Sequence, residues 1–189
     1  GDFTIRGIDL AASYAFDLGP GRLSTNMVGT YQLEREFAPV PGGGASTVYD
    51  CVGVVSPECQ DYEWRHIANA RYSVGRYTFG LRWRYYGELD YQSPYTGDPL
   101  VADKLVCSKS AGVTGAATCL GEGKLPAYNY FDLSSSIQLG DYTTWTIGVN
   151  NVADKEPPLV GAGLALNGNA PGGYDQAGRY FFTSFNFKF

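Results

Sequence analysis

The sequence predicts an all-β fold made of long antiparallel strands, and three observations support this prediction. The 189 residues include 25 Gly, 15 Tyr and 10 Phe, a composition typical of strands joined by many turns. No apolar run reaches the ~18 residues that indicate a transmembrane helix. Apolar and polar residues instead alternate over long stretches, which gives each predicted strand two different faces.

The last stretch of the chain, residues 178–189, shows the alternation most clearly. One face carries Phe181, Phe185, Phe187 and Phe189, and the other face becomes polar toward the end. At ~3.3 Å per residue this stretch is long enough to cross a bilayer at the usual strand tilt, for which ~9–11 residues suffice. We therefore expect a membrane strand here. A soluble strand that packs its Phe face on a core is the alternative.

The first two predicted strands form a hairpin. The first covers residues 4–18, whose later even positions are apolar, whereas Asp9 and Asp17 stand at odd positions. The Gly-Pro-Gly sequence at 19–21 predicts a tight turn. Residues 22–37 then return with the same alternation, so two long strands are joined by a few residues.

Two more hairpins follow the same rule. Residues 64–74 and 77–91 alternate on either side of a Gly-Arg turn at 75–76. Residues 128–139 and 143–152 alternate on either side of a turn that begins with Gly-Asp. With the Phe strand, the sequence predicts about seven strands.

Long connections separate these hairpins and the last strand, and they are residues 38–63, 92–127 and 153–177. In an up-and-down meander all tight turns then lie at one end and all long connections at the other. Outer-membrane barrels have this arrangement, with turns toward the periplasm and loops outside. A connection as long as 92–127 indicates a functional surface loop.

The four cysteines lie in two of these connections. Cys51 and Cys59 are close together in the first, and Cys107 and Cys119 are close together in the second. Neither spacing matches the Cys-x2-Cys pairs of a zinc ribbon, and the single histidine cannot complete such a site. We expect two local disulfides, Cys51 with Cys59 and Cys107 with Cys119, in an oxidising compartment. Four free thiols in a cytosolic protein are the alternative, and no metal or cofactor is predicted.

Charge is distributed unevenly over the predicted strands. The charges with polar parity are Asp9, Asp17, Arg71, Arg82, Arg84, Asp132 and Lys188. A Lys or Arg that faces lipid at mid-membrane costs ~2–4 kcal/mol, so this parity is the one a membrane strand requires. The exceptions fall at the loop ends of their strands and are Arg6, Arg35, His66 and Arg179. The net charge of −5 leaves no basic face for nucleic acid, and that class of partner is excluded.

Three motifs stand out in the last sixty residues. They are Phe131-Asp132-Leu133, the run from Val149-Asn150-Asn151 to Asp154-Lys155-Glu156-Pro157-Pro158, and the run from Asn169 through Tyr174-Asp175 to Gly178-Arg179-Tyr180. Together they resemble the C-terminal end of a TonB-dependent outer-membrane receptor. The upstream hairpins resemble the same family less specifically, so that the resemblance covers nearly the whole chain. Phe189, preceded by Phe185 and Phe187, fits the signal by which the barrel-assembly machinery recognises its clients.

The resemblance implies a fold, a function and partners. The resemblance implies a 22-stranded barrel that is plugged by an N-terminal domain, with a short TonB-contacting segment before the plug. Neither the plug nor that segment is visible in residues 1–189, so we expect this chain to be the C-terminal part of the barrel. The implied function is active uptake, across a bacterial outer membrane, of a scarce ligand such as an iron-siderophore, haem, cobalamin or an oligosaccharide. The implied partners are outer-membrane lipid, the rest of the barrel and its plug, and the TonB system.

A few polar residues are candidates for contact with a ligand. We expect Arg71, Arg82, Arg84 and Glu88 to face the lumen, where they meet either an anionic ligand or the plug. Tyr91 belongs to a set of loop aromatics that either stack on a ligand or form the interfacial girdle. An acidic group near the first cysteine pair either binds a cation or is a solvated loop, and its members are Asp50, Glu58, Asp61 and Glu63.

Covalent chemistry is not expected. The one candidate base, His66, has apolar parity near a strand end, so an interfacial role is favoured over a catalytic one. Two other readings remain beside the transporter. One is a small self-contained outer-membrane barrel of eight strands with a structural or adhesive role, and the other is a soluble secreted β-protein. Exposed aromatic faces on every strand argue against the soluble form.

Overall fold

The computed structural model describes residues 2–38, 48–55, 60–91, 106–107, 119–120, 124–158 and 173–189. Seven long strands form one antiparallel sheet in the order β1-β2-β6-β7-β12-β13-β14. Their bounds are β1 Asp2–Leu18, β2 Gly21–Ala38, β6 Trp64–Val74, β7 Tyr77–Tyr86, β12 Tyr128–Leu139, β13 Thr143–Asn150 and β14 Tyr180–Phe187. The predicted all-β meander is confirmed. Within the described ranges there is no helix long and apolar enough to cross a membrane.

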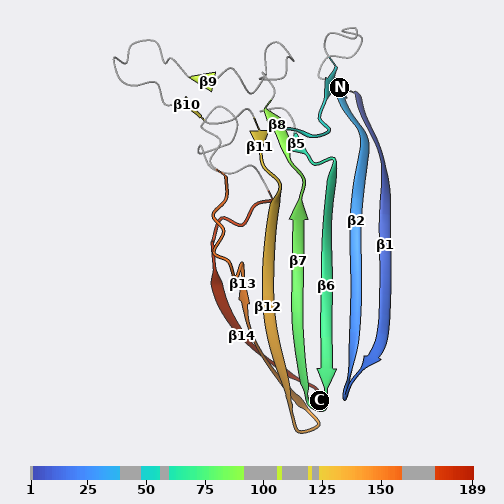
Figure 1. Ribbon diagram of the computed structural model, residues 1–189, viewed down its shortest axis with the longest axis vertical. Coiled ribbons are helices and arrows are strands. Elements are labelled where there is room, and N and C mark those ends of the chain that lie inside the picture. The colour runs from blue at the N-terminus through green and yellow to red at the C-terminus, as the bar shows by residue number, and fades with distance from the viewer. Residues whose placement is uncertain are drawn as a thin grey trace.

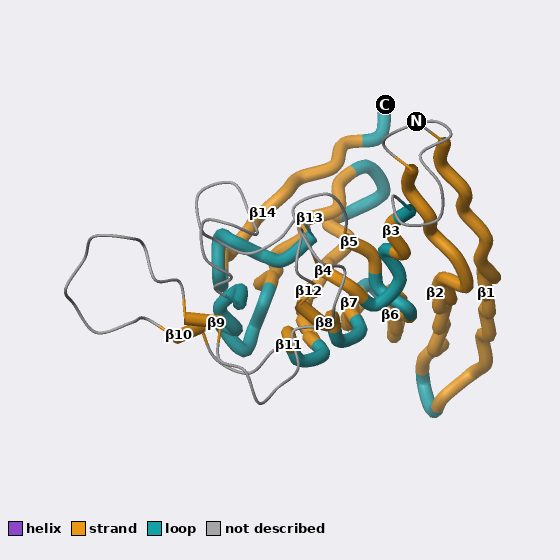
Figure 2. Tube along the Cα trace, turned by 90° about the horizontal axis from the view of Figure 1, so that it is seen from above, coloured by secondary structure: helices purple, strands orange, loops and turns teal. Residues whose placement is uncertain are grey.

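The strands lie side by side along the long axis of the molecule (Figure 1), and seen from above the sheet curves into an arc (Figure 2). The three tight turns lie together at one end, which we call the turn end, and the longer connections lie at the other, the loop end. Gly19, Gly75 and Gly140 occupy these turns with φ of 57°, 55° and 69°. Only glycine adopts this left-handed region freely, which explains why each hairpin reverses at that residue.

A β-bulge interrupts the β1–β2 pair near the loop end. Arg6 lies opposite Glu34, but the next residue, Gly7, lies opposite Gln32, so Leu33 is an extra residue on β2. The Gln32 side chain is buried, and its amide Nε2 donates to the carbonyl oxygens of Arg6 (3.1 Å) and Glu34 (2.8 Å). These bonds satisfy backbone groups at the irregular position.

The bulge also corrects the expected position of Arg35. Regular alternation placed Arg35 on the apolar side, but the extra residue reverses the parity, so Arg35 lies opposite Ile5 on the polar side. Its Nη1 is 3.1 Å from Oδ2 of Asp61. Counting alternate residues cannot detect one inserted residue, and for Arg35 the prediction was wrong.

The loop end contains short strands that the sequence did not predict. They are β3 Tyr49–Asp50, β4 Val54–Val55, β5 Gln60–Asp61, β8 Leu89–Tyr91, β9 Val106–Cys107, β10 Cys119–Leu120 and β11 Lys124–Leu125. Four of these form a second sheet in the order β11-β8-β4-β5. Residues 77–91 are therefore not one strand: β7 ends at Tyr86, and β8 leaves the main sheet after Gly87. At Gly87 a Cβ would lie 2.9 Å from the carbonyl oxygen of Trp64, so only glycine fits this close approach.

Buried apolar residues gather at the loop end, where the second sheet meets the main one. The cluster consists of Val55, Tyr62, Leu89, Leu125, Tyr128, Tyr130 and Tyr174, with Tyr86 packed against it. The long strands are different, because large apolar side chains such as Phe79 and Ile147 remain 49% and 45% exposed. Among the described residues, no protein layer covers that side of the main sheet.

Candidate functional site

The register divides the side chains of the main sheet between two faces. Below the bulge, the apolar face holds the even residues of β1 and β6 and the odd residues of β2, β7, β12, β13 and β14. The polar face holds the alternate residues. In this part of the described strands the apolar face carries no Asp, Glu, Lys or Arg. The predicted separation of charge by face is therefore confirmed.

Arg84, on the polar face of β7, is held in an ion-pair cluster with Asp132 and Asp175, which we call the clasp. Its Nε donates to Oδ2 of Asp132 (3.1 Å), and its Nη2 donates to Oδ1 of Asp132 (2.9 Å) and to Oδ2 of Asp175 (3.2 Å). The three side chains are only 18%, 8% and 11% exposed. The planar guanidinium fork matches a carboxylate with two parallel bonds, and Arg84 uses its Nε and Nη2 groups for partners within the chain.

The clasp joins three segments that are distant in the sequence. The backbone N–H of Asn151, just after β13, donates to Oδ1 of Asp132 (2.8 Å), and the N–H of Asp175 donates to the hydroxyl of Tyr130 (3.3 Å). The Arg84 guanidinium also lies 5.0 Å from the centre of the Tyr130 ring. The segment that contains Asp175 is thereby attached to β7 and β12 at the loop end.

A second contact continues this attachment toward the last strand. The backbone N–H of Arg179 donates to Oδ1 of Asp154 (2.8 Å), and a Cβ at Gly178 would lie 3.2 Å from the same oxygen. Asn151 and Asp154 adopt left-handed backbone conformations, with φ of 50° and 52°. The three motifs singled out in the sequence therefore meet in one network, a contact that alternation along the strands does not predict.

Arg71 and Arg82 differ from Arg84, because neither forms an ion pair with a described residue. Arg82 lies opposite Asp132, but both oxygens of that carboxylate are bonded to Arg84, and Arg82 Nε only reaches Oδ1 of Asn69 at 3.4 Å. Both side chains are exposed on the polar face. Two guanidinium groups on adjacent strands are thus available to an anionic group.

The other two candidates lie outside the main sheet. Glu88 follows β7 and is 3.4 Å from the Nζ of Lys124, which also lies 3.1 Å from Asp90. Hydrogen bonds to Asp90 and Glu88 raise the pKa of Lys124 above its usual value. Tyr91 belongs to β8, and its backbone pairs in parallel with Val55, while its side chain is outside the described part of the structure. Glu88 therefore acts within the loop-end sheet rather than beside Arg71.

The cysteines are only partly described. Cys51 is completely buried and is not a free thiol. Its expected partner, Cys59, lies outside the described residues. Cys107 and Cys119 lie directly opposite each other in the β9–β10 pair, which places their backbones as a local disulfide would require. Both pairings remain predictions.

The C-terminal phenylalanines lie on the apolar face of the edge strand β14 and beyond it. The Phe185 ring stacks on Trp145 at 5.9 Å and on Phe187 at 6.5 Å between ring centres. Phe189 follows the end of β14 and is fully exposed. The three expected recognition residues therefore form an exposed aromatic end, and their role in assembly remains a prediction.

His66 lies on the apolar face within an aromatic group. Trp64 Nε1 donates to its Nδ1 (2.9 Å), which assigns the ring proton to Nε2, and its ring stacks on Tyr85 at 5.1 Å. Its ring also meets the edge of Trp83 at 4.4 Å. His66 thus lies among aromatic rings, and its interfacial role remains a prediction.

The acidic residues near the first cysteine pair do not gather. Asp61 pairs with Arg35, Glu63 accepts a hydrogen bond from the Tyr31 hydroxyl (2.6 Å), and Asp50 caps the backbone of Val52. Glu58 lies outside the described residues. In the described ranges no group of three or more potential metal ligands occurs.

Comparisons with protein-family models, with curated proteins and with solved structures found no match.

Proposed function

We propose that this chain forms part of the wall of a TonB-dependent outer-membrane receptor, which takes up a scarce ligand across a bacterial outer membrane. The observation that carries the proposal is the separation of charge between the two faces of a seven-stranded meander. In this arrangement the apolar face meets lipid chains and the polar face lines the lumen. The choice of receptor family rests on the three sequence motifs, which resemble the C-terminal end of TonB-dependent outer-membrane receptors.

The two unpaired edges of the sheet favour a barrel with more strands than these seven. Among the described strands, β1 pairs only with β2, and β14 pairs only with β13. In lipid, the unpaired backbone groups of both edges would each cost several kcal/mol. The proposal therefore requires further strands beside β1 and β14, as the 22-stranded barrel implied by the resemblance would provide.

The two ends of the sheet would have different roles. The tight turns would face the periplasm, and the loop end, with its buried tyrosine cluster and the clasp, would face outward. The clasp would hold the base of one outer loop in place, while Arg71 and Arg82 would contact the plug or an anionic ligand inside the lumen. No covalent step on the ligand is proposed.

The first test is the intact mass of the protein extracted from outer membranes, together with its binding to the periplasmic domain of TonB. We expect a mass several times the 20.5 kDa of this chain and saturable TonB binding. A large outer-membrane protein that does not bind TonB would contradict the TonB-dependent energy source but not the proposal that this chain forms part of a barrel wall. A protein absent from the outer membrane would contradict both.

One alternative has an observation in its favour. Seven strands with two free edges need only one more strand to close an eight-stranded barrel, a size that occurs in outer membranes. Such a barrel would have a structural or adhesive role. An outer-membrane protein with a mass near 20.5 kDa would favour this reading over the receptor.

A further inference from the structure

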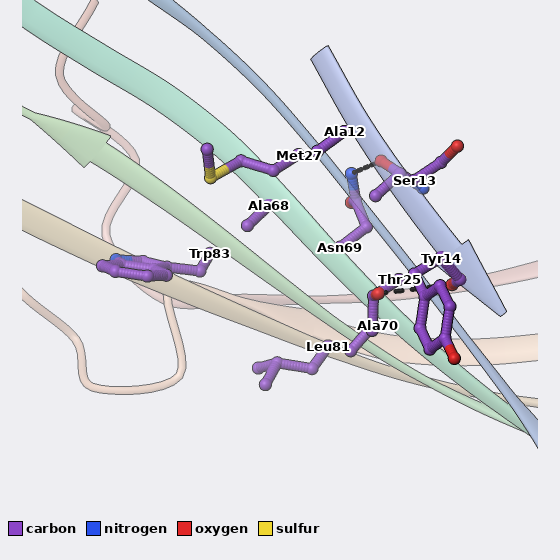
Figure 3. Close-up of a pocket in the computed structure, with 11 residues that line it drawn as sticks. Ala12, Ser13, Tyr14, Thr25, Met27, Ala68, Asn69, Ala70, Leu81 and Trp83 are labelled. Atoms are coloured by element: carbon purple, nitrogen blue, oxygen red, sulfur yellow. Dashed lines mark hydrogen bonds between the residues drawn. The ribbon is translucent and has the colours of Figure 1, made fainter. Parts of the chain in front are cut away.

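A hollow of about 320 Å³ lies on the apolar face across the first four strands of the main sheet. Figure 3 shows its small residues, including Ala68 and Ala70, with bulkier side chains such as Met27, Leu81 and Trp83 around them. In the register, Met27, Ala68 and Trp83 stand in one row across β2, β6 and β7. The small side chains on neighbouring strands leave a depression between large apolar ones.

Few side chains of the hollow are available to hydrogen-bond an occupant. The Thr25 hydroxyl donates to the Tyr14 carbonyl oxygen (3.3 Å), and Trp83 Nε1 donates to Oδ1 of Asn129 (2.8 Å). Asn26 and Asn69 contribute from the polar face, and their amides are bonded to each other (2.9 Å). The Tyr14 side chain, which also lines the hollow, is 68% exposed. An occupant that carries a polar group would lose its hydration here with little compensation. The site therefore suits a purely hydrocarbon group.

The position of the hollow along the strands points to the same occupant. Ala70 lies four residues from the turn end of β6, and Ala12 lies six residues from the turn end of β1. This is about 13–20 Å along the strands, or about 10–15 Å in height at barrel tilt, which is near the middle of the ~25 Å apolar band. At that depth the surrounding molecules are the distal parts of lipid chains.

We propose that the hollow binds one acyl chain of a membrane lipid, seated across β1, β2, β6 and β7 with its distal part against Ala68 and Trp83. This inference rests on the proposed membrane orientation of the apolar face. An unbranched chain can fill a depression between fixed side chains, restoring contacts that a void would lose. A second copy of the chain is the competing occupant, and it would have to present a matching apolar ridge.

The hollow can be tested by filling it. In Ala68→Leu the larger side chain occupies the space between Met27 and Trp83, whereas Ala15→Leu adds the same atoms on the polar face and serves as the control. The intact protein is released from membranes in mild detergent, and bound lipid is counted by native mass spectrometry. We expect one retained lipid per protein, lost about tenfold in Ala68→Leu because overpacking opposes binding, and unchanged in Ala15→Leu.

A fluorescence measurement separates failure of this inference from failure of the membrane orientation. Trp64 and Trp145 are replaced by Phe, so that Trp83 reports for this chain, and the protein is placed in vesicles of phosphatidylcholine brominated at successive positions along the acyl chain. We expect the strongest quenching by bromines on the distal part of the chain. Equal lipid retention in all variants, or a dimer abolished by Ala68→Leu, would overturn the acyl-chain site. Absence of quenching by every lipid would overturn the membrane orientation itself.

Discussion

The two faces of the main sheet are built by the same seven strands from alternate residues, yet they differ in almost every property. Below the bulge, the described residues of the apolar face include no Asp, Glu, Lys or Arg, and aromatic rings on this face contact one another in groups such as Trp145 with Phe185. The polar face carries ion pairs, amide pairs and the guanidinium groups of Arg71 and Arg82, which form no ion pair with a described residue. The difference teaches that alternation along each strand assigns residues to two faces with different surroundings. Below the bulge, the charged residues of the described strands are found on the polar face.

The largest expected effect comes from moving a charge from one face to the other. Ile147→Arg places a guanidinium on the apolar face four residues from the turn end of β13, and it is expected to abolish assembly into the outer membrane, at a cost of ~2–4 kcal/mol near mid-membrane. Phe185→Arg lies two residues from the end of β14, nearer the membrane surface, and is expected to impair assembly less. Ser184→Arg and Thr146→Arg change the adjacent residues on the polar face and are expected to be tolerated. Heat-modifiable migration of the folded protein on gels measures the outcome. Equal losses at both parities would contradict the assignment of the faces.

The next effect concerns a part of the polar face that is buried. Asp132→Asn leaves Arg84 without its bidentate partner, and loss of one member of a buried pair typically costs about 3–5 kcal/mol. We expect lower thermal stability and faster proteolysis near Asp175. The matched control is Asp17→Asn, which removes an exposed pair with Arg22 and is expected to cost ~0–1 kcal/mol. Equal effects of the two variants would show that the clasp contributes no more than a surface ion pair.

Alkaline pH is expected to loosen the loop end before the long strands. Burial raises the pKa of Tyr62 and of Tyr174 above the usual 10.0 of a tyrosine. Since the folded state holds these protons more tightly than the unfolded chain, the stabilisation is complete below pH 10 and is lost as the pH rises through the folded-state pKa values. Hydrogen exchange at Tyr62 and Tyr174 should rise above pH 10 earlier than in β6. Simultaneous loss of protection throughout the sheet would argue against this order.

The smallest effect on folding is expected at Arg71 and Arg82. Replacing both by Gln should change the free energy of unfolding by no more than ~0.5 kcal/mol, as is usual for exposed residues that form no ion pair. If an acidic segment docks against these residues, the double variant should release it, and limited proteolysis of the intact protein should become faster. Arg22→Gln, whose partner Asp17 is on this chain, is the control and should not change the cleavage rate.

Most of the main sheet could be predicted because its strands are long and alternate regularly. The predicted strand 128–139 matches β12 residue for residue, and 64–74 matches β6. The two-residue strands of the loop end could not be predicted, because so few residues show no period and their pairing depends on tertiary contacts.

For the candidate site, the sequence predicted only the face of the sheet on which each residue lies. Alternation put Arg71, Arg82 and Arg84 on one side, but it could not reveal that Arg84 is bonded to two carboxylates while the other two form no ion pair with a described residue. Asp175 was quoted only as part of a motif. Its contact with Arg84 spans ninety-one positions of the chain, and alternation along a strand holds no information about such a contact.

The bulge at Leu33 has a consequence for insertions and deletions in the gene. Because Leu33 is the extra residue of β2, an in-frame loss of that codon would remove the bulge and leave regular pairing, with Glu34 still opposite Arg6 and Arg35 still opposite Ile5. Arg35 would therefore stay on the polar side, where it pairs with Asp61, while the Gln32 amide would lose the irregular position whose carbonyl groups it now satisfies. The loop end of this hairpin thus tolerates the loss of one residue at the bulge, whereas the same loss in a strand without a bulge would reverse every side chain that follows.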